Sequence, residues 1–502
     1  MVERVVEIVR VGADLRLETI ARRRPPHRLL PSSGVMSRTQ FVISRRTVAW
    51  KADEPTGSPT TRKATMTTSD RTATSANSTG SPGSITRADC EQRDANDPLR
   101  DCREEFLLPE GTIYLDGNSL GPRTKGAAER AQEVITDEWG TGLIGSWNTA
   151  GWWDLPAKLG EKVAGLVGGG AGSTVVTDTT SINLFKAASA ALKMQAEDSS
   201  DRRVILTQRE NFPSDIYMLE GLAEQLGDGY EVRLVDDEEV TAGFPTTMSD
   251  EVALVVLTHV NYRTGRLFDM GTTTSAIHSG GAMVIWDLCH SAGALPIDLA
   301  GTGADMAIGC TYKFLNGGPG SPAFIWVAEA LQNRFSQPLS GWWSHAQPFD
   351  MAPDYRPADG IRRYLTGTQG ILSMSVAELG LDIHSRVDME QIREKSLALS
   401  DLFIDLVDER LADHPVEVVT PREHAHRGSQ VSITHPEGFA VMSALIERGI
   451  IGDYREPEVL RFGLTPLYIG FTEVWDTVEA LRDILDNRLW DTPAHKVRGA
   501  VT

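Results

Sequence analysis

Five apolar runs rich in β-branched residues limit the folds that this chain can adopt. They are "RVILTQ" (203–208), "VALVVLTHV" (252–260), "AMVIWDL" (282–288), "ADMAIGC" (304–310) and "PAFIWV" (322–327). Runs that are apolar throughout, rather than alternating with polar residues, are typical of strands covered on both faces of a parallel sheet. Helical patterns such as "SINLFKAASAALKM" and "SDIYMLEGLAEQL" precede and separate them. We therefore expect an α/β fold with a mostly parallel central sheet and helices on both faces.

Composition divides the 502 residues into four predicted regions. Residues 1–95 are basic and then Ser/Thr-rich, with too few apolar residues to offset chain entropy, so we expect them to be disordered. Residues 96–150 are expected to contribute to a small domain and to the active site. The strand and helix patterns of 151–350 predict a large α/β domain. Long helical patterns with short strands between them predict a smaller α+β domain over 351–495.

The start of the chain admits three interpretations. Residues 2–21 ("VERVVEIVRVGADLRLETIA") fit a short amphipathic helix or a transit peptide, and their four acidic residues argue against the transit peptide. The third interpretation is that translation begins at Met66 rather than Met1. The sequence leaves the choice open.

Charge and cysteine content narrow the class of protein. The net charge of −20 argues against a nucleic-acid or anionic-membrane partner. The four cysteines lack CxxC spacing, which indicates neither a disulfide framework nor a metal site, and this pattern fits a reducing, cytoplasmic environment. No apolar run approaches the roughly 18 residues of a membrane span.

Three chemically active residue types follow successive predicted strands. Asp287 ends an apolar run, His290 lies three residues later, and Lys313 follows the next run within "GCTYKFLNGGPG" (309–320). A lysine amine can form a Schiff base with an aldehyde cofactor, and a carboxylate facing a pyridinium nitrogen keeps that ring an electron acceptor. Taken singly, each residue has a plainer interpretation: a helix cap, a satisfied polar group and a solvated lysine. The combination in this order favours the catalytic interpretation.

A candidate anion site precedes a helical pattern. Thr179, Thr180 and Ser181 lie at its start, where free N–H groups and the helix dipole attract phosphate. An ordinary Ser/Thr cap explains this segment equally well when it is considered alone.

From about Ile113 to Leu489 the chain resembles the fold-type-I pyridoxal phosphate (PLP) enzymes of the class V aminotransferase group, and within it the kynureninase family. The resemblance rests on eight motifs: "YLDGNSLG" (114–121), "SWNTAGWWDLP" (146–156), "NFPSD" (211–215), "HVNYRTG" (259–265), "WDLCHSAG" (286–293), "TYKFLNGGPG" (311–320), "GWWSH" (341–345) and "RFGLTPLY" (461–468). Ser146, Trp147 and Thr368 stand where the vertebrate type has other residues, so the chain is similar to the bacterial type.

The resemblance implies a role for each matching residue. Lys313 would form the Schiff base and move the substrate's Cα proton, Asp287 would pair with the ring nitrogen, and Tyr312 would relay a proton. The implied cofactor-binding residues are Thr180, Ser181, Phe212, Pro213, Ser214, Asp215, Thr258, Asp287, His290, Tyr312 and Lys313, with Trp342 and Thr368 reaching the phosphate from a second subunit. The implied substrate-binding residues are Asn118, Ser119, Trp147 and Arg461, of which Arg461 would hold the α-carboxylate.

The implied activity is PLP-dependent hydrolysis of L-kynurenine to anthranilate and L-alanine, in tryptophan catabolism, by a homodimer with shared active sites. Two alternatives are another class V lyase or aminotransferase, such as a cysteine desulfurase, and a non-catalytic protein that retains the fold. A desulfurase needs a reactive cysteine after the lysine, and no cysteine follows Cys310. A non-catalytic protein would be expected to have lost Lys313 or Asp287, and both are present.

Overall fold

A computed structural model of the chain describes residues 5–11, 14–20, 84–199 and 201–498. The chain forms two compact units, Met1–Gly80 and Ser81–Thr502. In the first, β1 (Val5–Val11) and β2 (Asp14–Ile20) pair antiparallel, with Val5 opposite Ile20. The helix considered for residues 2–21 is therefore wrong, because the valines and isoleucines there favour a strand. The rest of the predicted extension up to residue 83, including Met66, lies outside the described residues.

The predicted disordered extension ends too late in the sequence. Residues Arg87–Ala95 form helix α1, which begins with a capping box between Thr86 and Asp89 and buries Cys90. The carboxylate of Asp94 then accepts hydrogen bonds from the backbone N–H groups of Phe471 and Thr472, at the start of α13 (Phe471–Asp486). The segment therefore belongs to the second unit.

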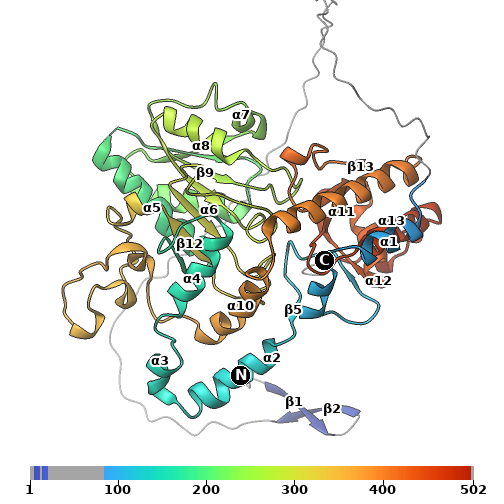
Figure 1. Ribbon diagram of the computed structural model, residues 1–502, viewed down its shortest axis with the longest axis horizontal. Helices are drawn as coiled ribbons and strands as arrows, with labels where there is room; N and C mark the ends of the chain where they lie inside the picture. Colours follow the sequence, from blue (N-terminus) through green and yellow to red (C-terminus); the bar gives the residue numbers. More distant parts are fainter. Residues whose placement is uncertain (1–4, 12–13, 21–83, 200, 499–502) are drawn as a thin grey trace, which may run out of the picture. The chain divides into compact units, whose positions relative to one another are not determined.

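The second unit contains a seven-stranded sheet with the order β6-β12-β11-β10-β9-β7-β8. Two of its strands, β9 and β12, are labelled in Figure 1. Neighbours from β11 to β8 are parallel, and β12 is antiparallel to both strands beside it. The strands are β6 (Thr174–Val176), β7 (Val204–Gln208), β8 (Glu231–Val235), β9 (Val252–Thr258), β10 (Met283–Asp287), β11 (Met306–Gly309) and β12 (Phe324–Val327). This arrangement confirms the expected mostly parallel sheet.

Each face of this sheet has its own hydrophobic core. Val284 and Trp286 of β10 point into one core, and Ile285 between them points into the other. The first core is closed by α4 (Leu155–Leu166), α8 (Met270–Ser279) and α10 (Ile371–His384). The second is closed by α5 (Thr180–Asp198) and α6 (Pro213–Leu226). Continuous apolar strands thus have helices on both faces.

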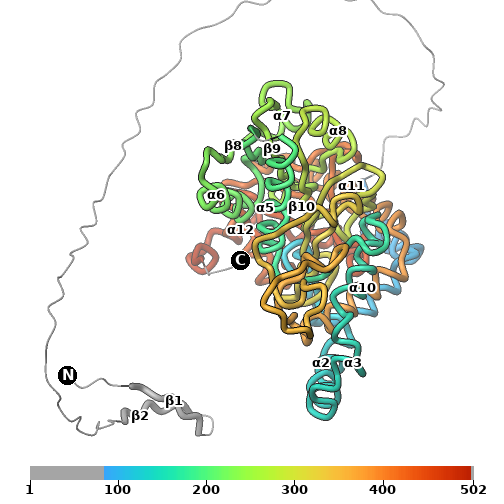
Figure 2. Tube along the Cα trace, turned by 90° about the vertical axis from the view of Figure 1, so that its left-hand side faces the viewer, coloured from blue at the N-terminus to red at the C-terminus, as the bar shows by residue number. Residues whose placement is uncertain are grey.

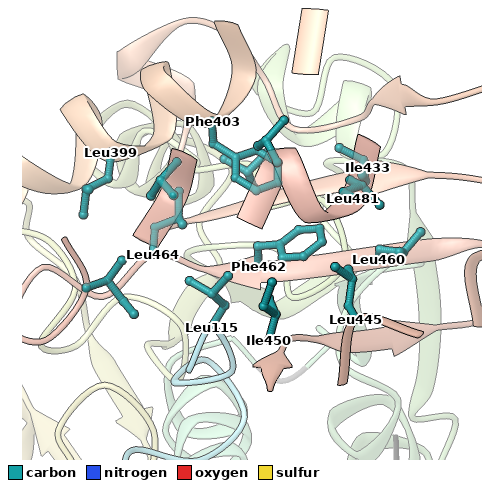
Figure 3. Packing of buried hydrophobic residues seen from close by; sticks show 14 of the residues in the cluster. Leu115, Leu399, Phe403, Ile433, Leu445, Ile450, Leu460, Phe462, Leu464 and Leu481 are labelled. Atoms are coloured by element: carbon teal, nitrogen blue, oxygen red, sulfur yellow. The ribbon is translucent and has the colours of Figure 1, made fainter. Parts of the chain in front are cut away.

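A second, antiparallel sheet has the order β13-β14-β17-β16. Its strands are β13 (Glu417–Val418), β14 (Gln430–Thr434), β16 (Asp453–Arg455) and β17 (Val459–Gly463). Residues of α11 (Met389–Arg410), α12 (Gly438–Glu447) and α13 pack on it, and Phe403, Leu445 and Phe462 lie in this core (Figure 3). The N-terminal segment joins it, because β4 (Ile113–Tyr114) pairs with β15 (Ile450–Ile451).

Helix α10 contributes to both parts of the unit. Its residues Met374 and Leu381 lie in the core of the large sheet, whereas Ile383 lies in the core of the small sheet. The predicted small domain begins at residue 351 and so includes a helix that mostly covers the large sheet. The Pro- and aromatic-rich stretch after Gly341 follows the last strand of the large sheet, and the chain then packs on that sheet again with α10.

A helical arm, α2 (Ala127–Glu133) to α3 (Ser146–Thr149), projects from one end of the second unit (Figure 2). It exposes Trp139, Leu143 and Ile144. Other short strands and α-helices are β3 (Phe106–Leu107), β5 (Arg123–Thr124), α7 (Asp237–Thr241) and α9 (Glu329–Gln332). Across the described ranges, none of the helices has the length and apolar character needed to cross a membrane.

Candidate active site

The polar residues predicted from the strand ends meet at one edge of the large sheet. Thr258 ends β9 and Asp287 ends β10, while Lys313 follows β11. Together with residues at the start of α5 and α6 they line a cavity of about 260 Å³. The carboxyl ends of parallel strands are where open α/β sheets bind ligands.

Lys313 is buried in this cavity and contacts His290. Its Nζ lies 3.0 Å from His290 Nε2, and the residue is 9% exposed. Burial, reinforced by the charge of Lys313, places the pKa of His290 well below its ordinary value. The neutral ring can accept a hydrogen bond from the lysine amine. The Nδ1 of His290 is buried and has no hydrogen-bond partner among the described residues.

Two buried carboxyl groups face the same lysine. The backbone N–H of Cys289 donates to Asp287 Oδ1 at 2.8 Å, and burial raises the pKa of Asp287. Burial also raises the pKa of Asp215 well above its ordinary value, and the nearby Asp287 raises it further. Within the described chain, Asp215 Oδ2 has no hydrogen-bond partner. The site thus holds acidic groups that are incompletely satisfied by the protein.

The opposite side of the cavity is the start of helix α5. Thr179 caps this helix and accepts a hydrogen bond from the N–H of Ile182 at 3.3 Å, and Thr180 and Ser181 line the cavity. A helix of 19 residues directs its dipole and free N–H groups at this point. Gly320, in the loop after Lys313, has a φ of +72° and also lines the cavity.

Aromatic rings border the space in front of Lys313. The lysine Nζ lies 5.6 Å from the centroid of the Phe212 ring, which meets Tyr262 edge-on at 5.2 Å. Tyr312 also lines the cavity, and burial raises the pKa of its hydroxyl. Pro213 occupies the first turn of α6, which places Ser214 and Asp215 at the cavity.

These residues fit PLP. The cavity offers a lysine amine, a carboxyl group, aromatic walls and an anion-binding helix end, which match the aldehyde, the ring nitrogen, the ring faces and the phosphate. Two buried polar atoms, His290 Nδ1 and Asp215 Oδ2, lack partners in the described part of the chain. Both residues line this cavity, where a bound ligand would give these atoms a partner.

Arg461 lies at the end of the site formed by the small sheet. Its Nη1 donates to the backbone oxygen of Tyr262, whose side chain lines the cavity. Its Nε donates to Asp453 Oδ1 at 2.6 Å, and its Nη2 contacts Ser119 Oγ at 3.1 Å. Asn118, which precedes Ser119 in the chain, is fully buried. The predicted carboxylate-binding residue is therefore near the cavity and already paired with an aspartate.

Three predicted residues lie apart from the cavity of their own chain. Trp342 is 39% exposed and donates to the backbone oxygen of Pro348 at 3.2 Å, and Thr368 is exposed in the loop before α10. Trp147 packs edge-on against Trp152 at 5.6 Å and Trp343 at 5.3 Å. Its contacts match a packing role within the chain, and a role against a substrate ring stays a prediction.

Sequence reasoning missed several residues of the site. Tyr262 and Cys289 line the cavity and lie inside the motifs "HVNYRTG" and "WDLCHSAG", and Cys289 directly precedes His290. Asp116, Asp453 and Arg455 surround Arg461. Asp116 lies within "YLDGNSLG", and this motif could have predicted its place in the site. Asp453 and Arg455 lie in none of the quoted motifs, and only the pairing of β16 with β17 brings them to Arg461.

Comparison with known proteins decides the family. The chain is 57% identical to the kynureninase of Pseudomonas fluorescens over 417 residues, which are 83% of this chain and all of that protein. It is 55% identical to the kynureninase of Burkholderia pseudomallei (strain 1106a) over the same shares. Residues 392–481 match the kynureninase C-terminal domain. The chain belongs to the kynureninase family.

Solved structures place the fold. An apo cysteine desulfurase from Thermococcus onnurineus NA1 superposes with a TM-score of 0.64 at 18% identity, covering 77% of this chain and 98% of that chain. A mutant of the cystine C-S lyase C-DES with glycine covalently linked to its PLP cofactor gives a TM-score of 0.66 at 17% identity, with coverage of 76% and 99%. The chain therefore has the fold of these PLP enzymes, as the sequence predicted.

Proposed function

We propose that the protein hydrolyses L-kynurenine to anthranilate and L-alanine with PLP as its cofactor. The observation that carries this proposal is the convergence of Lys313, Asp287 and the start of α5 on one cavity. Membership of the kynureninase family selects this reaction among those that such a site can support. The similarity to desulfurase structures extends to the fold alone, and no cysteine follows Cys310 to act in that chemistry.

Several residues would hold the cofactor. Thr180 and Ser181, with the N–H groups of α5, would bind its phosphate, Phe212 would pack on its ring, and Asp287 would hold a proton at its ring nitrogen. When bound, PLP supplies an electron-accepting ring and an aldehyde that links to amines. His290 Nδ1 and Asp215 Oδ2, which have no partner in the described chain, would contact the cofactor in the same cavity.

Lys313 would move the proton on the substrate's α-carbon. Its amine lies against His290, whose neutral ring accepts a hydrogen bond and orients it without adding a second positive charge. Tyr312 would deliver a proton to the β-carbon after the bond to the γ-carbon breaks, since burial keeps its hydroxyl protonated. Proton transfers of this kind contribute about 10²–10⁴-fold each. Arg461 would hold the α-carboxylate so that these atoms meet.

The proposed assembly is a homodimer in the cytoplasm. Trp342 and Thr368 are exposed and separate from the cavity of their own chain, which suits residues that serve the phosphate of a second subunit. In the described chain all four cysteines are unpaired, which suits a reducing compartment. Mixing Lys313→Ala protein with Thr368→Ala protein should restore activity if sites are shared, and no restoration in mixed dimers would contradict sharing.

The assay for the activity uses the purified holoenzyme. Addition of L-kynurenine should give anthranilate fluorescence and an equal amount of L-alanine. L-cysteine should give no sulfide under the same conditions. Absence of anthranilate from protein that carries bound PLP would overturn the proposed function.

A further inference from the structure

The guanidinium of Arg461 is held on one edge before any substrate arrives. Arg461 on β17 lies opposite Asp453 on β16 in the strand register, and both side chains are 1% exposed. Nε and Nη2 of the arginine both donate to the Asp453 carboxylate. This two-pronged pairing fixes the plane of the guanidinium.

The pairing restricts how a carboxylate can approach. With the Nε–Nη2 edge occupied, a ligand carboxylate is directed to the end formed by Nη1 and Nη2. At that end Nη1 contacts the backbone oxygen of Tyr262, and Nη2 contacts the Ser119 hydroxyl at 3.1 Å. Ser119 Oγ itself donates to Asp453, so a substrate carboxylate that binds Arg461 end-on would accept from the remaining N–H of Nη1 and take the place of the Ser119 oxygen at Nη2.

A second arginine shares the same aspartate. Arg455 Nη2 lies 2.8 Å from Asp453 Oδ2, and Ser119 Oγ donates to this oxygen at 2.8 Å. The side chain of Arg455 is 35% exposed, so it adds positive charge at the mouth of the cluster. One buried aspartate thus orients two guanidinium groups.

Asp116 is a second carboxyl group in the cluster. Its Oδ1 is buried and has no hydrogen-bond partner in the described ranges. The groups that face it are Asp453 and Arg455 from β16, Arg461 from β17, Tyr114 from β4, Tyr468, and the Ser119 hydroxyl. Burial, followed by repulsion from Asp453, raises the pKa of Asp116 to about 7.

The net charge of the cluster depends on whether Asp116 carries a proton. Two arginines and Asp453 sum to +1 when Asp116 is protonated, and to zero when it is ionised. An incoming carboxylate is neutralised in the first state and leaves an uncompensated negative charge in the second. Carboxylate binding therefore favours protonated Asp116.

We propose that Asp453 is the positioning residue that sets Arg461 for end-on binding of the substrate's α-carboxylate, and that a proton on Asp116 adjusts the charge of this site. This inference rests on the proposed function. It assigns the amino-acid end of the substrate to a cluster of five side chains: Asp116, Ser119, Asp453, Arg455 and Arg461.

The first test is Asp453→Asn in the holoenzyme. We expect KM for L-kynurenine to rise by about 10- to 100-fold while kcat changes by less than about threefold, because an arginine held in the wrong plane binds the carboxylate less well. The Kd for L-alanine, followed by the cofactor absorbance, should rise by a similar factor. Asp97→Asn is the matched control, since Asp97 forms a buried ion pair with Lys395 at 2.6 Å outside the site, and its KM should stay unchanged.

An unchanged KM and L-alanine Kd in Asp453→Asn would overturn the positioning role. If that variant does not fold, Asp453→Glu keeps the charge and shifts the guanidinium, and it should raise KM in the same direction. An unchanged KM in Asp453→Glu would also count against the proposal. Absence of turnover in the wild-type holoenzyme would instead overturn the proposed function, and the L-alanine titration separates the two failures.

The second test compares pH profiles. The ratio of KM at pH 8.5 to KM at pH 6 should be at least about threefold larger in the wild type than in Asp116→Asn, because the amide stays neutral across this range. The comparison between the two proteins cancels titrations that they share. Equal ratios would show that the proton on Asp116 does not act on substrate binding.

Discussion

The two ends of the proposed active site differ in how the protein satisfies their polar groups. At the cofactor end, where Lys313 lies at the strand ends of the large sheet, buried polar atoms such as Asp215 Oδ2 lack partners within the described chain. At the carboxylate end, Arg461 is paired with Asp453 and the protein supplies its contacts. The cofactor end would thus gain partners from its ligand, whereas Arg461 at the carboxylate end is oriented by the protein before a ligand binds. Substitutions at the two ends should therefore affect different kinetic constants.

Lys313→Ala should cause the largest loss. Removal of the amine proposed to move the substrate proton is expected to lower kcat by at least about 10³-fold. Stopped assays of anthranilate formation would measure it. Lys395→Ala is the control, because it removes another buried lysine that is ion-paired outside the site. Turnover of Lys313→Ala within tenfold of the wild type would remove this lysine from the reaction.

Asp287→Asn should act at the same end with a smaller effect. The amide cannot hold a proton at a ring nitrogen, so kcat should fall by about 10²–10⁴-fold while KM changes little. Steady-state kinetics with L-kynurenine separate the two constants. A rise in KM alone would place Asp287 with the substrate-binding residues instead.

Arg461→Lys should show the behaviour of the carboxylate end. A lysine keeps the charge but loses the planar fork, so we expect kcat/KM to fall by about 10- to 100-fold, mainly through KM. The variant also leaves Asp453 with a weaker partner, which should lower Tm. A fall confined to kcat would contradict the assignment of Arg461 to substrate binding.

Asp116→Asn should give the smallest effect, in stability rather than turnover. The pKa of Asp116 is raised from 3.8 to about 7, so the folded protein favours its protonated form, and the stability gained from that proton is lost as pH rises through about 7. The Tm of the variant relative to the wild type should therefore be higher at pH 8 than at pH 5, by a few degrees. Thermal scans at both pH values would measure it, and an equal difference at the two would show that Asp116 is already ionised at pH 5.

The same contrast explains what could be predicted from sequence. The cofactor end follows from local order: apolar strand, Asp287, His290, strand, Lys313, all within one sheet whose topology is fixed by parallel pairing. The carboxylate end depends on contacts between residues far apart in the chain, as between Ser119 and Asp453. Spacing carries no signal for such contacts, so family resemblance found Arg461 and missed its aspartate.

Boundaries were the weaker part of the prediction for a similar reason. Helix α1 looks polar because it buries little beyond Cys90, and its place is set by the carboxylate of Asp94 at the distant start of α13. Trp147 is surrounded by other tryptophans in sequence and in space, so composition could not assign it to a pocket.

Helix α10 has a consequence for the range of ligands. Met374 and Leu381 lie in one core and Ile383 in the other, so a single helix packs against both the part that carries Lys313 and the part that carries Arg461. A change in how this helix packs would therefore alter the distance between the amine and the guanidinium, and with it the fit of a ligand that carries both an amino and a carboxylate group.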